Sequence, residues 1–389
     1  METMTSRERV VCALNHEPVD RLPIDMGSHT AAGISMFAYW NLREYLGLST
    51  NNIWIPDMVQ GLAYVDIDIL KRFHCDCIML EPHFRDTIKW NPRGKYQFII
   101  PAAANPQVTE DGSWIISKNS ALMRMPAGGF FFSGEWLNDW GEGSEDDRIA
   151  LYAREAERIF KETEYATNFA GYSHGLDISG YGAGSVNNAI LAYDELKKLR
   201  ELREQSLSGS LRRMGRIIDS FGQYIQMVTM ADDMGAQNGL MCNPNYIEEF
   251  CMPYYKRFCE FVHANSDIKV CLHSCGSIKP VIPLLVEAGI DVLNPVQISA
   301  DNMDPQELKD EFGGQICFWG GGCNTQAVLG TGTPEQVVDN VRHLVRIFKN
   351  NGGYVFNQVH NIMGDVSPEN IVAMFDTAYE ESFYIKKEY

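Results

Sequence analysis

The stretch "GQICFWGGG" (residues 314–322), followed by "GTPEQVVDNVRHLVRIFKN" (residues 332–350), contains one complete unit of the fold. An apolar run typical of a buried strand gives way to glycines and then to an amphipathic helix. Thr333 is placed to cap the helix, Pro334 to occupy its first position and Gln336 to complete a capping box. This stretch therefore predicts a strand, a turn and a helix.

The same unit recurs twice nearby. In both copies an apolar run precedes a helix that starts with a capping residue and a proline. Because strands and helices alternate without hairpins, the sheet is predicted to be parallel. The two copies are "DVLNPVQ" before "MDPQELKDEFG", where Asp304, Pro305 and Glu307 take the three roles, and "GYVFNQVHN" before "VSPENIVAMFDTAYEE", where Ser367 is the cap and Pro368 follows.

Further apolar runs extend this pattern toward the N-terminus and bring the number of predicted strands to eight, which is the number that closes a (β/α)8 barrel. We therefore predict one barrel domain over residues 1–389. A stretch at about 84–135, rich in turn residues and alternating patterns, predicts a small β-rich insertion after the second strand, which could cover the barrel mouth. The predicted strands are 21–26, 76–82, 166–172, 226–233, 268–273, 291–295, 316–320 and 353–359.

The charge and composition exclude several classes of protein. A formal charge of −18 without a long basic run argues against binding to nucleic acid or to anionic membrane surfaces. The sequence has no signal peptide and no apolar run long enough to span a bilayer. Ten cysteines without compact spacing fit reduced thiols. We therefore expect a soluble, cytoplasmic protein.

Polar residues follow most of the predicted strands. In a barrel of this kind the catalytic groups lie at the carboxyl ends of the strands, so these side chains are expected to form one ring at one mouth. The ring consists of Glu81, Asp232, Asp233, His273, Cys275, Asn294, Cys323 and His360.

His273 and Cys275 are the strongest metal-ligand candidates in that ring. Residues two apart on a strand share a face, so one ion can reach both. Imidazole and thiolate suit Zn²⁺, whose catalytic sites use three protein ligands, and the third would be His360 or Cys323. "HCDC" (residues 74–77) has similar residue types but starts its strand, and we interpret it as structural.

Other residues of the ring have candidate roles with a substrate. Asp233, Asp232 or Glu81 could orient it or handle a proton. The residues predicted to line a pocket for an aromatic or planar substrate are Tyr172, His174, Tyr181, Trp319 and Asn294.

Three segments carry a resemblance to a known family: "RERVVCALNHEPVDRLPID", "HSCGSIKPVIPLLVEAGIDVLNPVQ" and "GTPEQV…GGYVFNQVHNI…VSPENI". At these segments the chain resembles the uroporphyrinogen decarboxylase superfamily, and the similarity extends over nearly the whole chain. The resemblance implies a (β/α)8 barrel. The superfamily includes a cobalamin-dependent methyltransferase branch in which an H-x-C pair and a later Cys hold zinc, and His273 and Cys275 match that pair.

The chain departs from the family pattern at two places. The decarboxylases carry an arginine-containing segment after the first strand and an Asp after the second, whereas this chain has "PIDMGSHTAAG" and Glu81. A substrate with many carboxylates would find little to bind there. In addition, the third zinc-binding Cys of the methyltransferases is replaced by His360 within "QVHNI".

The resemblance and the departures together predict a zinc-dependent methyltransferase. It would move a methyl group between a small substrate and the cobalt of a corrinoid (cobalamin) carried by a partner protein. The substrate could be a methoxylated aromatic, another methylated compound or a thiol acceptor. The alternatives are a tetrapyrrole decarboxylase, which needs no metal, and a non-catalytic partner of a corrinoid protein.

Overall fold

A parallel sheet of seven strands forms the centre of the protein. The computed structural model describes residues 2–82, 86–118, 121–134, 143–171, 176 and 186–384, without the side chains of 186–189. The strands pair in the order β16-β15-β14-β13-β10-β9-β2, and every pair is parallel. They are β2 (Cys77–Met79), β9 (Ala166–Phe169), β10 (Met227–Ala231), β13 (Lys269–His273), β14 (Val292–Asn294), β15 (Cys317–Trp319) and β16 (Tyr354–Val355).

The predicted first strand closes this sheet into a barrel. On one side the Asp25 N–H donates to the Phe356 carbonyl at 2.9 Å, and on the other the Asp76 N–H donates to the Ile24 carbonyl at 2.7 Å. Ile24 forms a single parallel bridge with Phe356 instead of a regular strand, because the preceding Pro23 has no N–H to donate. The (β/α)8 prediction is confirmed, but the six-residue first strand predicted at 21–26 is reduced to a bridge.

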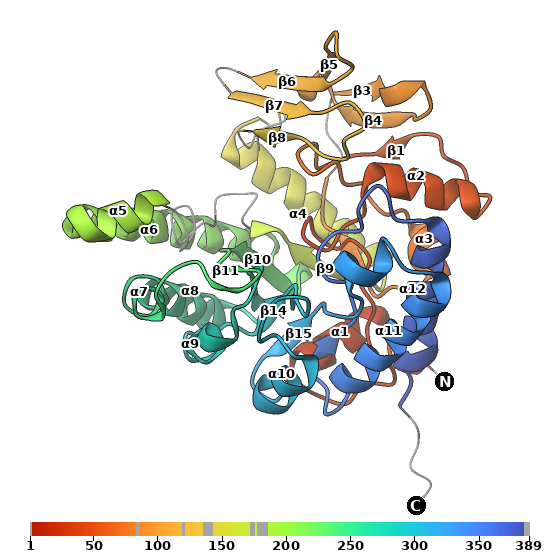
Figure 1. The fold of residues 1–389 in the computed structure, drawn as a ribbon. Helices are drawn as coiled ribbons and strands as arrows, with labels where there is room; N and C mark the ends of the chain where they lie inside the picture. The colour runs from red at the N-terminus through yellow and green to blue at the C-terminus, as the bar shows by residue number, and fades with distance from the viewer. Residues whose placement is uncertain are drawn as a thin grey trace, which may run out of the picture.

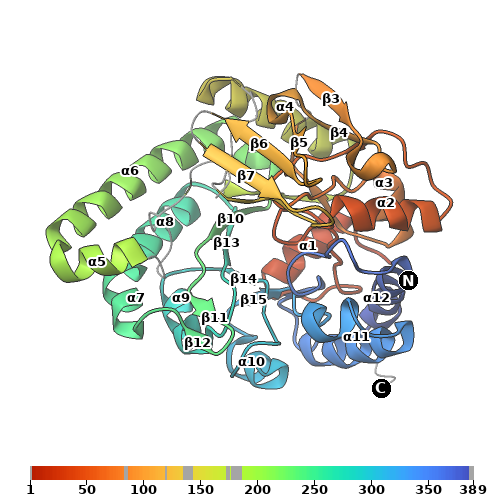
Figure 2. The same cartoon turned by 45° about the horizontal axis from the view of Figure 1, so that its top comes forward.

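Helices surround the barrel (Figures 1 and 2). The cap predictions at Thr333, Ser367 and Asp304 are confirmed, but only Thr333 forms the reciprocal capping box. The helices are α1 (Ser6–Leu14), α2 (Met36–Tyr45), α3 (Ile67–Arg72), α4 (Glu145–Glu162), α5 (Val186–Asp194), α6 (Leu196–Phe221), α7 (Pro244–Phe250), α8 (Met252–Asn265), α9 (Ile282–Glu287), α10 (Pro305–Phe312), α11 (Pro334–Phe348) and α12 (Pro368–Ser382).

The barrel interior is filled by side chains and closed at the amino end of the strands by α1. Alternate residues of each strand point inward, because successive strand residues face opposite sides. One inward layer is apolar and packs against Val10, Ala13 and Leu14 of α1. The inward residues of this cluster are Cys77, Ala166, Met227, Cys271, Val292, Cys317, Trp319 and Val355.

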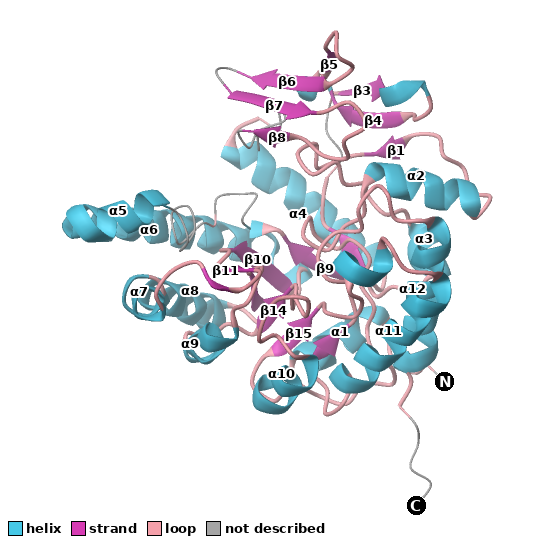
Figure 3. Ribbon diagram, in the orientation of Figure 1, coloured by secondary structure: helices cyan, strands magenta, loops and turns pink. Residues whose placement is uncertain are grey.

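The predicted β-rich insertion is present between β2 and β9, at the top of Figure 1 and as the arrows there in Figure 3. Its two sheets are antiparallel except for one parallel pairing with β1 (Ile53–Trp54), which precedes β2. The Phe132 N–H donates to the Val59 carbonyl at 2.8 Å, so the insertion is tied to the first loop region. Its strands are β3 (Thr87–Trp90), β4 (Phe98–Pro101), β5 (Gln107–Val108), β6 (Trp114–Lys118), β7 (Ala121–Met125) and β8 (Ser133–Gly134).

Two short strands, β11 (Gly235–Ala236) and β12 (Gly239–Leu240), form a hairpin after β10.

Among the described residues, no helix combines the length and the apolar character needed to span a bilayer.

Candidate metal centre at the barrel mouth

His273 ends strand β13 and points into the barrel at its carboxyl end. It pairs in register with Asn294 of the neighbouring strand β14, so the two side chains lie beside each other on one face. His273 Nδ1 and Asn294 Oδ1 are 2.7 Å apart. Both side chains are buried.

Cys275 follows in a loop that is fixed to the turn after β10. Its backbone N–H donates to Asp233 Oδ1 at 2.8 Å. Gly276 has φ +89°, and a Cβ there would lie 2.3 Å from the backbone of Gly235. A side chain at this position is therefore excluded by the close approach of the two loops, which explains why glycine follows the cysteine.

His360 follows β16 in a loop that packs against the segment after the barrel-closing bridge. The Gly33 N–H donates to Asn361 Oδ1 at 2.7 Å, and Asn361 Nδ2 donates to the Thr30 carbonyl at 3.0 Å. Segments more than 300 residues apart in sequence thus meet at His360. Burial, and next the nearby His273, lower the pKa of His360 to about 4.

These three side chains converge. One ligand atom from each of His273, Cys275 and His360 lies within 4.8 Å of the others. Cys275 Sγ is 3.4 Å from His273 Nε2, and the two imidazole centres are 5.3 Å apart. Imidazole nitrogen and thiolate sulfur are donors that Zn²⁺ prefers, so the residues present fit this ion.

The two neighbouring aspartates after β10 have different surroundings. Asp233 Oδ1 lies 3.8 Å from His273 Nε2. Burial, and next the Asp233 carboxylate, raise the pKa of the Cys275 thiol in the metal-free protein. Asp232 is buried and accepts a hydrogen bond from the Tyr255 hydroxyl of α8 at 2.8 Å. Only Asp233 of the pair therefore adjoins the cluster, because consecutive residues face opposite sides.

Two other predicted site residues lie apart from the cluster. Cys323 is completely buried in the hydrophobic core, and burial raises the pKa of its thiol to about 12. Glu81 accepts a hydrogen bond from the Tyr152 hydroxyl of α4 at 2.7 Å. Among the described residues, neither side chain shares the metal-ligand cluster.

Asn294 and Trp319, predicted to bind substrate, form a buried chain of hydrogen bonds. Asn294 Nδ2 donates to the Trp319 carbonyl at 2.9 Å, and the Trp319 indole N–H donates to Asp25 Oδ2 at 2.9 Å. Burial raises the pKa of Asp25 to about 6. The other residues predicted for this pocket, Tyr172, His174 and Tyr181, lie outside the described residues.

His29 is a buried histidine near the cluster that sequence reasoning missed. Burial, and next the charges of His273 and His360, lower its pKa to about 3. The only sequence signal was its place in "PIDMGSHTAAG", the segment that follows a predicted strand end. A lone histidine in that segment gives no sign of proximity to His273 and His360, which lie 244 and 331 positions later in the chain.

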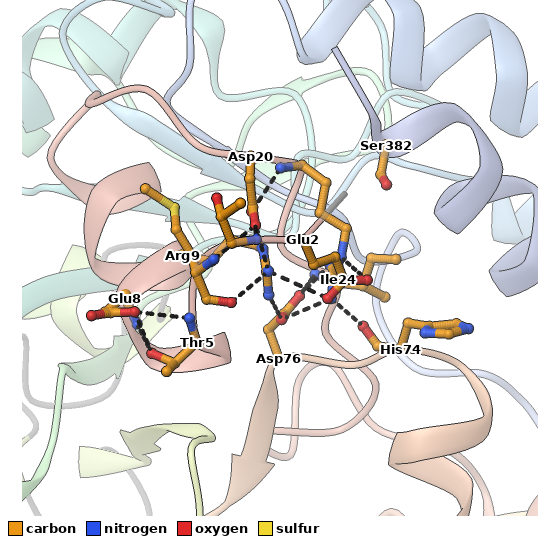
Figure 4. Close-up of polar contacts among 12 residues, drawn as sticks. Glu2, Thr5, Glu8, Arg9, Asp20, Ile24, His74, Asp76 and Ser382 are labelled. Carbon is orange, nitrogen blue, oxygen red and sulfur yellow. Dashed lines mark hydrogen bonds and ion pairs between the residues drawn. The ribbon is translucent and has the colours of Figure 1, made fainter.

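The second run of His and Cys residues, "HCDC", lies at the other end of the barrel and has structural contacts. His74 stacks on Tyr379 with ring centres 3.6 Å apart. Asp76 accepts a hydrogen bond from Arg9 at 2.6 Å (Figure 4) and another from Arg21 at 2.7 Å. Cys75 and Cys77 are buried, and burial raises the pKa of both thiols.

Sequence comparison identifies the relatives of this chain. A family model described as uroporphyrinogen decarboxylase (URO-D) matches residues 191–381, which include all three cluster residues. A uroporphyrinogen decarboxylase from Trichodesmium erythraeum is 23% identical over 199 residues, which are 49% of this chain and 52% of that protein. One from Chlorobaculum tepidum is 24% identical over 137 residues, 34% of this chain and 37% of that protein. The matches confirm the resemblance to the uroporphyrinogen decarboxylase superfamily, although they span about half or less of these relatives' length.

A solved structure shares the fold over almost the whole chain. A methyltransferase from Methanosarcina mazei superimposes with a TM-score of 0.58 and 15% sequence identity, covering 97% of this chain and 99% of that one. At this identity the likeness establishes the barrel fold.

Proposed function

We propose that the protein is a zinc-dependent methyltransferase that moves a methyl group between a small methylated substrate and the cobalt of a corrinoid carried by a partner protein. The observation that carries this proposal is the pairing of His273 and Cys275 at the carboxyl ends of the barrel strands, with His360 beside them. Soft and borderline ligands at this end of a barrel favour metal-assisted chemistry over a purely structural site. The fold shared with the Methanosarcina mazei methyltransferase supports this choice.

The residues of the cluster divide the work in this proposal. His273 and Cys275 hold the ion, since their ligand atoms are already 3.4 Å apart. Bound Zn²⁺ would supply Lewis-acid stabilisation of negative charge on a leaving oxygen or sulfur. Asp233 lies beside both ligands, and 57% of its side chain is exposed, so it can reach a substrate at the mouth.

A tetrapyrrole decarboxylase is the second candidate, because the curated relatives carry that name. Recognition of several carboxylates would need cationic groups. The segment of residues 25–34, which packs beside His360, contains neither arginine nor lysine. This composition favours the methyltransferase.

Metal analysis tests the zinc part of the proposal. Protein prepared without chelators is expected to contain about one zinc per chain. Cys275→Ala should lose most of it, whereas Cys12→Ala, a half-buried cysteine of α1, should retain it. Cys323→Ala is expected to behave like the control. Stoichiometric zinc in Cys275→Ala would place the metal elsewhere.

Methyl transfer itself is tested with a reduced corrinoid protein and a panel of methylated substrates. The corrinoid absorption spectrum should change on methylation, and His273→Ala should slow this change by at least about 100-fold, because a ligand to the ion is lost. An unchanged rate in His273→Ala contradicts the proposal. Efficient release of CO₂ from uroporphyrinogen would favour the decarboxylase, and absence of any turnover would favour a non-catalytic partner.

A further inference from the structure

The hydrogen bonds of His273 fix which ring nitrogen carries the proton. The Trp319 carbonyl can only accept, so the Asn294 atom that lies 2.9 Å from it is the amide nitrogen. The opposite amide atom, Oδ1, can likewise only accept, and it faces His273 Nδ1 at 2.7 Å. His273 therefore carries its proton on Nδ1, which leaves the Nε2 lone pair directed at the side where Cys275 Sγ lies 3.4 Å away.

In His360 the hydrogen bond places the proton on the other ring nitrogen, Nε2. The backbone N–H of Asn361 donates to His360 Nδ1 at 2.8 Å. A nitrogen that accepts this bond carries no proton, so the neutral ring is protonated on Nε2. A doubly protonated ring would place an Nδ1–H against the Asn361 N–H, so the ring is neutral and carries a single N–H.

The loop around His360 holds this arrangement in place. His360 has φ +60°, a left-handed conformation that non-glycine residues avoid. Gln358 Nε2 donates to the His360 carbonyl at 2.8 Å, and the side chain of Asn361 bonds Thr30 and Gly33. Such strained backbone persists where the surrounding structure over-determines it, and it occurs often at functional sites.

Because of these opposite proton positions, the two histidines differ in their ability to bind a metal ion. His273 offers a lone pair to a metal. For His360 to bind metal through Nε2, its proton would have to move to Nδ1, where it would face the Asn361 N–H at 2.8 Å. That change would break a hydrogen bond and set two donors against each other. Ligation through Nδ1 would displace the same N–H.

We infer that His360 donates a hydrogen bond from Nε2–H to an oxygen atom of the substrate, and that it is not the third metal ligand. The inference rests on the proposed methyl transfer and narrows its substrate to methyl ethers, such as methoxylated aromatics. An N–H donor pairs well with an ether or phenolate oxygen, poorly with a thioether sulfur, and not at all with a quaternary ammonium group.

The metal site can have three protein ligands without His360. The Asp233 Oδ1 atom lies 3.8 Å from His273 Nε2 and accepts a hydrogen bond from the Cys275 backbone N–H at 2.8 Å. Asp233 would be the third ligand in this arrangement, since carboxylate oxygen is a usual zinc ligand. His360, which lies beside His273 and Cys275, would then be available to a substrate oxygen.

Nitrogen NMR of protein labelled with ¹⁵N-histidine tests the proton positions without any turnover. In the metal-free protein the spectrum should show His273 as the Nδ1–H form and His360 as the Nε2–H form. Zinc should shift Nε2 of His273 and leave both His360 nitrogens as they were. Zinc-induced ligation shifts on His360, or a starting Nδ1–H form of that ring, would overturn the inference.

Two substitutions separate the donor role from the ligand role. Glutamine places an amide N–H₂ near the position of Nε2, whereas leucine removes the donor at similar size. Zinc affinity, measured by competition with a chelator, should stay within about threefold of the parent in His360→Gln and His360→Leu, but fall by 10–100-fold or more in Asp233→Asn. A comparable loss of zinc affinity in either His360 variant would make His360 a ligand.

Binding of 2-methoxyphenol by the zinc-loaded protein, compared with its methylthio analogue, tests the substrate class. His360→Leu should weaken binding of the oxygen compound about tenfold, and His360→Gln should restore part of it. A parent that does not prefer the oxygen compound, or variants that bind it equally well, would overturn the inference. Loss of zinc binding by the parent would instead contradict the proposed function, and the NMR result distinguishes the two failures.

Discussion

Both ends of the barrel contain buried polar side chains, but their hydrogen-bond partners differ. At the amino end, Arg9 lies between Asp20 at 2.7 Å and Asp76 at 2.6 Å (Figure 4). Arg21 bonds the other Asp76 oxygen at 2.7 Å. Burial alone would raise the pKa of Asp20, but the hydrogen bonds from Arg9 and from backbone N–H groups hold that pKa well below its usual range. Each buried carboxylate here is thus matched by an arginine.

At the carboxyl end the polar groups are not matched in this way. His273 is fixed by Asn294 on one side only, and its other nitrogen faces the thiol of Cys275. His360 is fixed through Nδ1, and within the described part of the chain its Nε2 makes no hydrogen bond. Groups held firmly on one side and open on the other are what a binding site requires.

Burial by itself does not mark a functional site in this protein. Asp76 and His273 are both buried at barrel strands. The difference is whether the protein itself saturates the hydrogen-bonding capacity of the side chain. A fully satisfied network stabilises the fold, whereas a partly satisfied one is left for a metal or a ligand.

Removal of the central carboxylate of the amino-end network should have the largest effect. Asp76→Ala leaves Arg9 and Arg21 buried with a missing partner, so the free energy of unfolding should fall by about 3–5 kcal/mol. Denaturant titration of the parent and the variant measures this loss. Should Asp76→Ala not fold, Asp76→Asn, which keeps the shape and two acceptor positions on one oxygen, provides the measurement. An effect below about 1 kcal/mol would show that the network is not a stabilising one.

Zinc binding at the carboxyl end of the barrel should depend on Asn294. Asn294→Leu removes the acceptor that fixes the proton of His273, and zinc affinity should fall by about 10–100-fold. Asn294→Asp keeps an acceptor and should retain affinity. Chelator competition measures both variants, and an unchanged affinity in Asn294→Leu would refute the ordering role.

Lys309 of α10 is a buried cation that, unlike Arg9 and Arg21, bonds a backbone carbonyl instead of a carboxylate. Its ammonium donates to the Gly352 carbonyl at 2.6 Å, and burial lowers its pKa to about 8. Because the unfolded chain holds this proton up to about pH 10.5, the native state binds fewer protons between these values, and stability should rise with pH there. The gain relative to Lys309→Met should be on the order of 1 kcal/mol per pKa unit. The unfolding free energies of the parent and of Lys309→Met, measured from pH 7 to 10, should diverge. Parallel curves would contradict the lowered pKa of Lys309.

The smallest effect is expected for a paired charge on the surface. Arg72 and Asp376 form two hydrogen bonds, but about 40% of each side chain is exposed. Solvent screening limits such pairs, so Arg72→Ala should cost less than about 1 kcal/mol. This variant is the control for Asp76→Ala, and similar losses in the two would mean that burial does not control the value of these ion pairs.

Much of the fold follows from short-range features that a sequence displays directly. Thr333, Pro334 and Gln336 specify a helix start because capping involves only residues within one turn. The apolar run around Cys317 specifies a strand for a similar reason. His273 and Cys275 were recognisable as a pair because they are two residues apart in the chain.

Only the tertiary structure decided how these parts work together. The barrel closes through Ile24, where proline prevents a regular strand, and this closure brings His29 and the loop of Asn361 together. Strand geometry placed Asp233 beside the cluster and turned Asp232 toward Tyr255, although the two are adjacent in sequence. Core packing buries Cys323, and its side chain is not among the three whose ligand atoms converge. Proton positions on the two histidines depend on acceptors and donors supplied by other strands and by loop backbone, and those partners exist only once the chain has folded.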